Sequence, residues 1–187
     1  MPTLRTTLGV KGFRPVVGTW DRKDLVYAFG ALNVISGRLT SRLLDCPARL
    51  KAKTGQSKCR HVQRAFARHL RDIARAYPAS RCPRVVIIID NAPWHRGAGI
   101  TAVLQEFPHL EFYRLPSYSP FLNPIERLWK ILRRRATHNR LFESMKALRQ
   151  ALRASFCYFQ STRQRLLSLV SQYKARRRRS EKNINAP

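Results

Sequence analysis

Two acidic residues, Asp90 and Glu126, lie where their carboxylates could act on a charged substrate. Asp90 directly follows five β-branched residues, 85–89, and precedes Asn91. Such a run predicts a strand that is buried on both faces, and open α/β sheets bind ligands beyond the carboxyl ends of their strands. A carboxylate there is destabilising unless it is paired or holds a cation. The alternative is that Asp90 only accepts a hydrogen bond within the next turn.

Glu126 stands in the first turn of a predicted amphipathic helix. The apolar stripe of this helix consists of Ile125, Leu128, Trp129 and Leu132. If Asn123 were the N-cap and Pro124 the first helical residue, Glu126 would close a capping box. Basic residues follow Glu126 at helical spacing, so the same face carries an acid and then a row of positive charge. These basic residues are Lys130, Arg133 and Arg134.

A pair of carboxylates from different elements fits the chemistry of phosphodiester bonds. In-line cleavage commonly uses two divalent ions about 3.5–4 Å apart, which stabilise the attacking and the leaving oxygen. Mg²⁺ prefers hard oxygen ligands and is held by one or two carboxylates, with water completing its coordination. If the two acids meet in space, the sequence predicts a site for Mg²⁺ or Mn²⁺ formed by Asp90 and Glu126.

Two stretches carry a resemblance to a known family. These are IIDNAPWH at 88–95 and LPSYSPFLNPIERLW at 115–129. Together they closely resemble the catalytic domain of Tc/mariner-type transposases, above all the bacterial insertion-sequence branch, over residues 9–159. The resemblance implies a ribonuclease-H-like α/β fold with a mixed central sheet flanked by helices. It also implies an Asp-Asp-Glu triad that binds two metal ions, and 35 residues lie between Asp90 and Glu126, which is typical of this family.

Further roles follow from the resemblance. His95, with Trp94 and Asn91, would shape the metal site or approach DNA, or else be a surface turn residue. Ser119, Pro120 and Asn123 would present the glutamate, or serve only as turn residues. Lys130, Arg133 and Arg134 would contact DNA. The implied partners are transposon ends, target DNA and a second copy of the chain, in the bacterial cytoplasm at the nucleoid.

The sequence departs from the family pattern at the first aspartate of the triad. That residue belongs on a strand ahead of residues 9–15, and residues 1–8 contain no acid. Asp21, Asp24 and Asp45 come too late and are weak substitutes. We therefore expect the chain to begin inside a longer transposase, with an incomplete first strand and impaired DNA cleavage and strand transfer. The alternative is a catalytically inactive DNA-binding remnant or inhibitor.

Composition limits the other classes. The 187 residues include 37 Lys and Arg against 10 Asp and Glu, for a net charge of +27, and 44% are hydrophobic. Such a charge calls for a polyanionic partner, whereas the apolar content excludes a disordered tail. An RNA-binding role would leave Asp90 and Glu126 unexplained, and neither a membrane-spanning run nor a membrane-surface helix is found. The four cysteines are expected to be free, since a zinc site at Cys59, His61 and Cys82 matches no common spacing.

The elements that must position the acids follow from periodicity. Apolar stretches at 25–32 and 38–44 predict a hairpin with a turn at Ser36 and Gly37. Helices are expected at 61–77, 100–107, 144–159 and 163–173, with strands at 84–90 and 111–115. A catalytic domain would cover residues 1–160, and residues 161–187 would form a C-terminal helix and a disordered basic tail.

Overall fold

The computed structural model describes residues 24–46, 55–117 and 119–169, and its first element is the predicted hairpin. Strand β1 (Leu25–Leu32) pairs antiparallel with β2 (Leu39–Cys46), so that Leu25 lies opposite Cys46. The turn is the predicted one. Gly37 adopts φ +67°, a left-handed conformation that favours glycine. The Asn33 Oδ1 atom accepts hydrogen bonds from the Ile35 and Ser36 amides at 2.9 and 2.8 Å.

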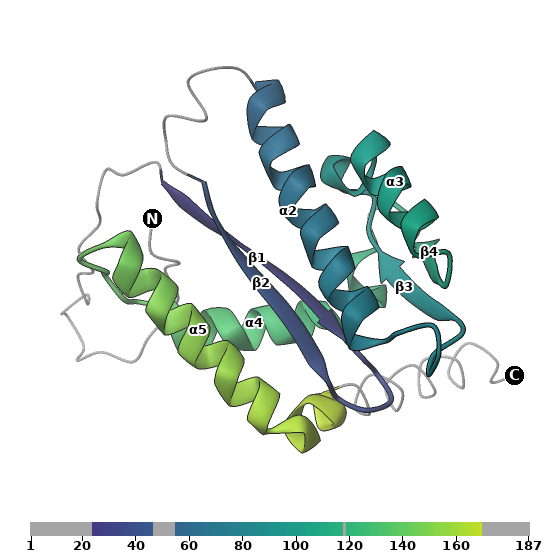
Figure 1. Cartoon of the computed structure of the whole chain (residues 1–187). Coiled ribbons are helices and arrows are strands. Elements are labelled where there is room, and N and C mark those ends of the chain that lie inside the picture. The colour runs from purple at the N-terminus through teal and green to yellow at the C-terminus, as the bar shows by residue number, and fades with distance from the viewer. Residues whose placement is uncertain (1–23, 47–54, 118, 170–187) are drawn as a thin grey trace, which may run out of the picture.

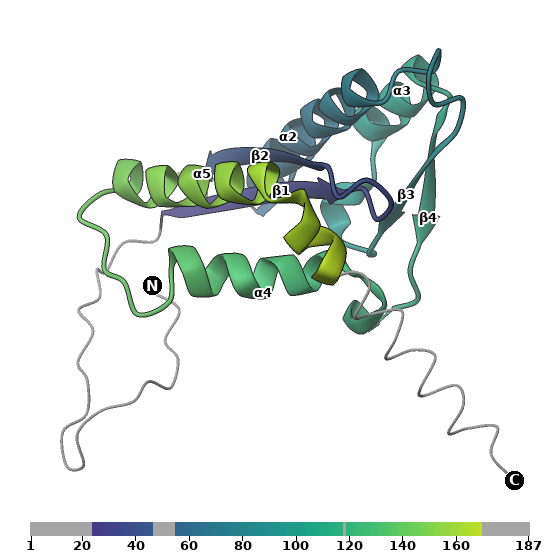
Figure 2. The ribbon, with the colours of Figure 1, turned by 90° about the horizontal axis from the view of Figure 1, so that it is seen from below.

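The hairpin lies between helices on both of its faces (Figures 1 and 2). Helix α2 (Gly55–Ala76) covers one face, and helices α4 (Ile125–Ala136) and α5 (Met145–Ser161) cover the other. Successive β1 side chains point to opposite faces, so Tyr27 and Phe29 pack with α2 while Val26 and Ala28 pack with α4 and α5. The uniformly apolar sequence of β1 is therefore explained by burial on two sides.

A second pair of strands carries Asp90. Strand β3 (Val85–Ile89) pairs in parallel with β4 (Leu110–Arg114), and helix α3 (Ala98–Glu106) connects them. The prediction that β3 is buried on both faces is wrong, because Val86 and Ile88 are 50% and 44% exposed. Within the described part of the chain, helices cover only the face that carries Ile87 and Ile89. The apolar run therefore predicted the strand correctly, but it did not predict that one face of the strand is exposed.

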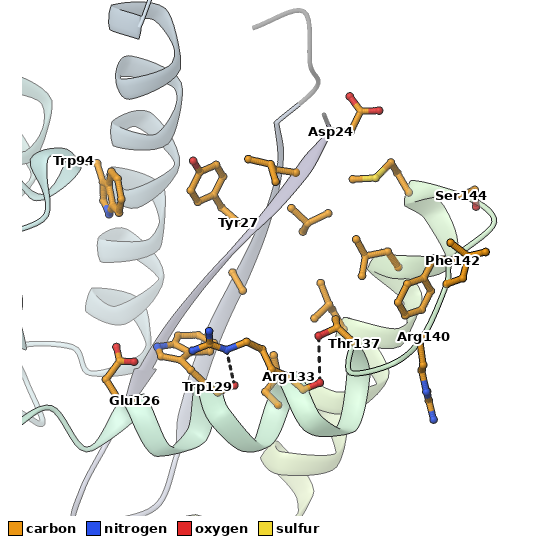
Figure 3. A pocket seen from close by; sticks show the side chains of 18 residues that line it. Asp24, Tyr27, Trp94, Glu126, Trp129, Arg133, Thr137, Arg140, Phe142 and Ser144 are labelled. Atoms are coloured by element: carbon orange, nitrogen blue, oxygen red, sulfur yellow. Dashed lines mark hydrogen bonds between the residues drawn. The ribbon is translucent and has the colours of Figure 1, made fainter. Parts of the chain in front are cut away.

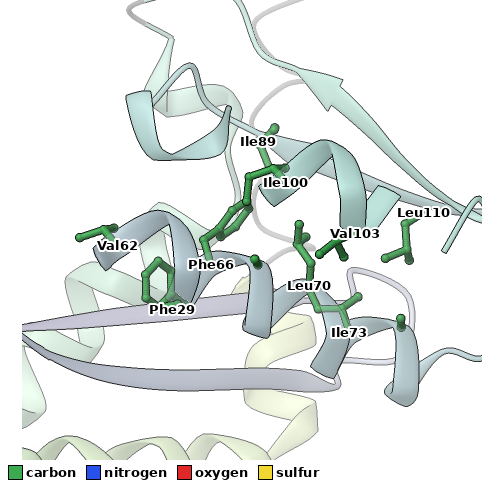
Figure 4. Close-up of a cluster of buried hydrophobic side chains, with 12 residues drawn as sticks. Phe29, Val62, Phe66, Leu70, Ile73, Ile89, Ile100, Val103 and Leu110 are labelled. Atoms are coloured by element: carbon green, nitrogen blue, oxygen red, sulfur yellow. The ribbon is translucent and has the colours of Figure 1, made fainter. Parts of the chain in front are cut away.

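The strand directions are mixed, as predicted, and the α/β class is confirmed. The described strands nevertheless form two separate pairs, β1 with β2 and β3 with β4, instead of one continuous sheet. Helix α2 packs against both pairs and holds them together through a cluster that includes Phe66, Leu70, Ile100 and Val103 (Figure 4). Helix α2 therefore supports both the hairpin and the strand that precedes Asp90.

The ends of the helices differ modestly from expectation. Helix α2 begins at Gly55 instead of residue 61, because its first turns are polar and lack the apolar period that revealed the rest. Helix α5 begins after Ser144, whose Oγ atom accepts the Ala147 amide at 3.1 Å. Residues 163–169 are helical, and 170–173 lie outside the described residues. Leu166, in this last segment, is fully buried with α4 and α5.

Gly30 sets how closely α4 approaches the hairpin. A Cβ atom on Gly30 would lie 2.8 Å from the Cη2 atom of Trp129. The absence of a side chain therefore lets the Trp129 ring lie directly on β1. Because Glu126 is less than one turn from Trp129 on the same helix, this contact helps to place the glutamate against the hairpin.

Two further findings concern the wider sequence predictions. No helix in the described ranges is both long and apolar enough to cross a membrane. All four cysteines, Cys46, Cys59, Cys82 and Cys157, are free thiols, as predicted.

Candidate active site

Asp90 lies immediately after β3 and participates in a tight local network. Its Oδ1 atom accepts the Ala92 amide at 3.1 Å, which confirms the predicted turn hydrogen bond. The same oxygen lies 2.9 Å from the Nδ1 atom of His95. No hydrogen bond from a described residue reaches Oδ2, and the side chain is 62% exposed. The turn therefore orients the carboxylate and leaves one oxygen available to a ligand.

His95 supports Asp90 from the protein interior. Its side chain is only 13% exposed, and its ring centroid lies 4.3 Å from that of Phe66 on α2. Burial lowers the pKa of His95, although the hydrogen bond and negative charge of Asp90 oppose this shift. The lowered pKa favours the neutral imidazole, whose Nδ1 atom lies within hydrogen-bond distance of the Asp90 carboxylate. This placement favours the role of shaping the acid over direct contact with DNA.

The loop that follows Asp90 is fixed by bonds to the neighbouring strand. The Asn91 side-chain amide donates to the Leu115 carbonyl at 2.8 Å, and the Arg114 guanidinium donates to the His95 carbonyl at 3.1 Å. The Leu115 amide in turn donates to the Ile89 carbonyl at 2.8 Å. Asn91 therefore fixes this loop to the end of β4, a role that its position beside Asp90 in the sequence did not predict. These hydrogen bonds attach the loop that begins with Asp90 to the end of β4 and so help to fix the position of the carboxylate.

Glu126 stands in the first turn of α4. Asn123 takes part in the start of this helix: its Oδ1 atom accepts the Ile125 amide at 3.3 Å and its carbonyl accepts the Glu126 amide at 3.2 Å. The predicted capping box is not found: Pro124, not Asn123, is the N-cap, the Asn123 side chain accepts the Ile125 amide instead of the Glu126 amide, and no hydrogen bond from a described residue reaches the Glu126 carboxylate. Glu126 is half-buried at the start of α4, and its carboxylate oxygens accept no hydrogen bond from the described residues.

Electrostatics link the two acids. Burial raises the pKa of Glu126 above its usual value, the positive charge of Arg133 opposes the rise, and the negative charge of Asp90 adds to it. The negative charge of Asp90 is the smallest of these three influences on the pKa of Glu126. Both carboxylates and a guanidinium thus contribute to a single electrostatic environment, formed by β3 and α4.

A cavity of about 670 Å³ extends from Glu126 along β1 (Figure 3). Its lining is largely apolar and comes from β1, α4 and the start of α5. Trp94, from the short helical turn Pro93–His95, also lines it. Glu126 and Asp24 both line the cavity but lie at opposite ends of it in Figure 3. Glu126 therefore borders a cavity that is large enough to admit part of another molecule.

The predicted basic residues differ in their relation to this hollow. All three are exposed on α4. Arg133 lines the cavity and donates from Nε to the Trp129 carbonyl at 3.3 Å, whereas Lys130 and Arg134 are outside the lining. Sequence reasoning missed the aromatic residues Tyr27 and Phe142 and the cationic residue Arg140. They come from separate elements, so no local pattern could have brought them together.

The candidate substitutes for a third acid have different positions. Asp45 forms an ion pair with Arg149 of α5, so its carboxylate is already engaged. Asp24 borders the cavity far from Glu126, and Asp21 lies outside the described residues. Among residues 24–46, 55–117 and 119–169, no three His, Cys, Asp or Glu side chains are placed to share a metal ion. Cys59, His61 and Cys82 are therefore not grouped as a metal site in this part of the chain.

Comparison with known proteins gives consistent results. The pattern of the family described as DDE superfamily endonuclease matches residues 55–149. An uncharacterised protein of Sinorhizobium fredii, y4pE/y4sA, is 33% identical over 79 residues, which cover 42% of this chain and 54% of that protein. A 39 kDa protein of insertion element IS630 from Shigella sonnei is 26% identical over 152 residues, or 81% of this chain and 40% of that protein.

Two solved structures share the fold. A Mos1 transposase paired-end complex with the left transposon end has a TM-score of 0.55 at 17% identity, covering 93% of this chain and 50% of that chain. A Mos1 mariner paired-end complex with Mn has a TM-score of 0.54, also at 17% identity, covering 91% and 50%. The chain thus spans roughly half the length of the proteins that it matches.

Proposed function

The chain belongs to the DDE superfamily endonucleases, and on this premise we propose that it is of Tc/mariner type and acts on DNA through Asp90 and Glu126. The reaction is metal-dependent cleavage of a phosphodiester bond, followed by strand transfer. The observation that supports this most is that Asp90 and Glu126, separated by 35 intervening residues, both keep carboxylate oxygens that accept no hydrogen bond from the described residues, and the charge of Asp90 also raises the pKa of Glu126.

The donor set suits Mg²⁺ or Mn²⁺. Asp90 presents an exposed oxygen without a described partner, and the carboxylate of Glu126 accepts no hydrogen bond from the described chain. Burial and the negative charge of Asp90 raise the pKa of Glu126, and a divalent cation would offset both effects. When bound, two such ions would stabilise the charge that develops on the attacking and leaving oxygens.

The remaining residues have supporting roles in this proposal. His95 orients the Asp90 carboxylate through Nδ1, and Phe66 holds the imidazole ring in place. Arg133 partly balances the charge of Glu126. Lys130 and Arg134, exposed on the same helix, would contact DNA phosphates beside the two acids, with Arg133. The proposed partners are transposon ends and target DNA, handled by a homodimer at the bacterial nucleoid.

A second candidate function is DNA binding without turnover. It is favoured by one observation: among the described residues, no third acidic side chain joins Asp90 and Glu126. A two-metal site with two of its three carboxylates would bind metal weakly and lose most of its rate. The net charge of +27 would still support salt-sensitive binding to DNA.

Nicking of supercoiled plasmid separates these functions. With Mg²⁺ or Mn²⁺, we expect the 187-residue chain to nick weakly or not at all, because the metal site has two described acids. The control is Asp90→Ala, which removes one of them. Strong nicking that is lost in Asp90→Ala would disprove the impairment and support the enzyme. Nicking that is equal in both proteins would point to a contaminating nuclease and leave the assignment of Asp90 unsupported.

A further inference from the structure

A second cavity, separate from the acids, lies between α2 and α3. It measures about 390 Å³, and half of its ten lining residues are arginines. These are Arg60, Arg64, Arg68, Arg71 and Arg96. The rest of the lining is formed by Gln63 and by small or apolar residues, including Ala67, Gly99 and Ala102. We call this feature the arginine groove.

The groove carries positive charge that the described residues do not neutralise. Arg71 is paired with Glu106, its guanidinium 2.7 Å from the carboxylate. No described acid forms an ion pair with Arg60, Arg64, Arg68 or Arg96, and no acid lines the groove. All four of these side chains are exposed. Exposed like charges that are held close together repel one another, so an anionic partner would stabilise this surface.

The spacing of the arginines fits a row of phosphates. Arg60, Arg64, Arg68 and Arg71 repeat at intervals of four, four and three, which places them along one face of α2. From Arg60 to Arg71 the helix extends about 16 Å, against about 3.4 Å between successive phosphates of one DNA strand along its axis. The row is therefore long enough to meet several phosphates and longer than a single small anion requires.

The groove adjoins the loop that carries Asp90. Arg96 directly follows the turn Pro93–His95, and its carbonyl accepts the Gln63 side-chain amide of α2 at 2.9 Å. Its guanidinium donates to the Asn91 carbonyl at 3.4 Å. The loop after Asp90 is thus fastened to the helix that bears the arginines. A nucleic acid bound in the groove would therefore lie beside the loop that carries Asp90, in the proposed reaction centre.

We propose that the arginine groove binds the phosphate backbone of duplex DNA that flanks the reacting bond. No aromatic side chain lines the groove, which disfavours single strands, because proteins hold these largely by stacking their bases. Contacts to phosphates alone carry no base specificity. The proposal rests on the proposed function only in taking DNA as the partner; it needs neither metal nor cleavage.

The test is a triple substitution, Arg60→Gln, Arg64→Gln and Arg68→Gln. Glutamine retains good helix propensity and removes the charge. The control is Arg75→Gln, Arg81→Gln and Arg153→Gln, which removes the same charge from exposed residues outside the groove. Binding of a labelled duplex is measured by fluorescence anisotropy in EDTA over a range of salt concentrations. Thermal melting verifies that both variants are folded.

We expect the groove variant to bind the duplex at least about tenfold more weakly, with a log–log salt slope smaller by about 2–3, since each lost phosphate contact removes about 0.9. The control should change both values much less. Equal losses in the two variants would overturn the proposal, because overall charge would then explain binding; so would an unchanged groove variant. A loss seen for single-stranded DNA or duplex RNA but not for duplex DNA would overturn the choice of ligand. Mn²⁺ binding by the same variants tests the acids separately.

Discussion

Asp90→Asn and Glu126→Gln are each expected to weaken Mn²⁺ binding by at least about tenfold, as loss of even an indirect supporting group weakens metal sites by about 10–100-fold. Both substitutions preserve size and remove one negative charge. Asp90 loses its one oxygen without a described partner, and Glu126 loses a carboxylate that accepts no hydrogen bond from the described chain. Binding is measured from the electron paramagnetic resonance signal of free Mn²⁺, with a short DNA duplex present to supply phosphate oxygens.

Matched controls make the result specific. Asp45→Asn removes the same group from an ion pair with Arg149, and Glu143→Gln removes a carboxylate from an exposed position between α4 and α5. Neither should change Mn²⁺ affinity appreciably. If all four variants lose affinity alike, the ion is held by general surface charge. If only one of Asp90 and Glu126 matters, the acids do not form a common site.

Replacement of His69 is expected to make the protein resistant to mild acid. His69 lies in α2, is 2% exposed, and neither ring nitrogen has a described hydrogen-bond partner. Burial lowers its pKa from 6.5 to about 4; Asp72 opposes the shift and Arg42 reinforces it. The unfolded chain therefore takes up a proton between pH 6.5 and 4 while the folded protein does not. Stability conferred by neutral His69 is complete above this window and is lost as the pH falls through it.

The expected loss for the native protein between pH 7 and pH 5 is about 2 kcal/mol, or a fall of about 4–8 °C in Tm. His69→Leu should remove most of this dependence, because leucine fills the site without a titrating group. His61→Gln, on the same helix, removes a histidine whose ring is not fully buried and serves as the control. Thermal melts at pH 5 and pH 7 decide the matter. An equally large Tm drop in His69→Leu would show that other groups cause the acid sensitivity.

The sequence predicted the elements with strong local signals. The apolar strands and the glycine turn at Gly37 depend on residues that are close together in the chain. The polar first turns of α2 were missed because only its packed portion shows an apolar period. The exposed face of β3 was missed for a related reason: five β-branched residues specify a strand, but what covers each face depends on distant elements.

The same distinction applies to the candidate site: features encoded by neighbouring residues were predicted, and features that join distant segments were not. Asp90 and Glu126 were identified from motifs that lie within short stretches of sequence, and the turn hydrogen bond of Asp90 was anticipated from its neighbours. The buried position of His95 against Phe66, the bond from Asn91 to Leu115 and the arginine groove all join segments that are far apart in the chain. The junction of the arginines of α2 with Arg96 likewise depends on the fold.

The central claim is that Asp90 and Glu126 share one site, and titration of Glu126 by carboxyl-detected nuclear magnetic resonance tests it most directly. In the native protein the account predicts a Glu126 pKa above that of an ordinary glutamate. In Asp90→Asn this pKa should fall, because the negative charge that raises it has been removed, and in Asp45→Asn it should not change. A Glu126 pKa that is the same in the native protein and in Asp90→Asn would contradict the account.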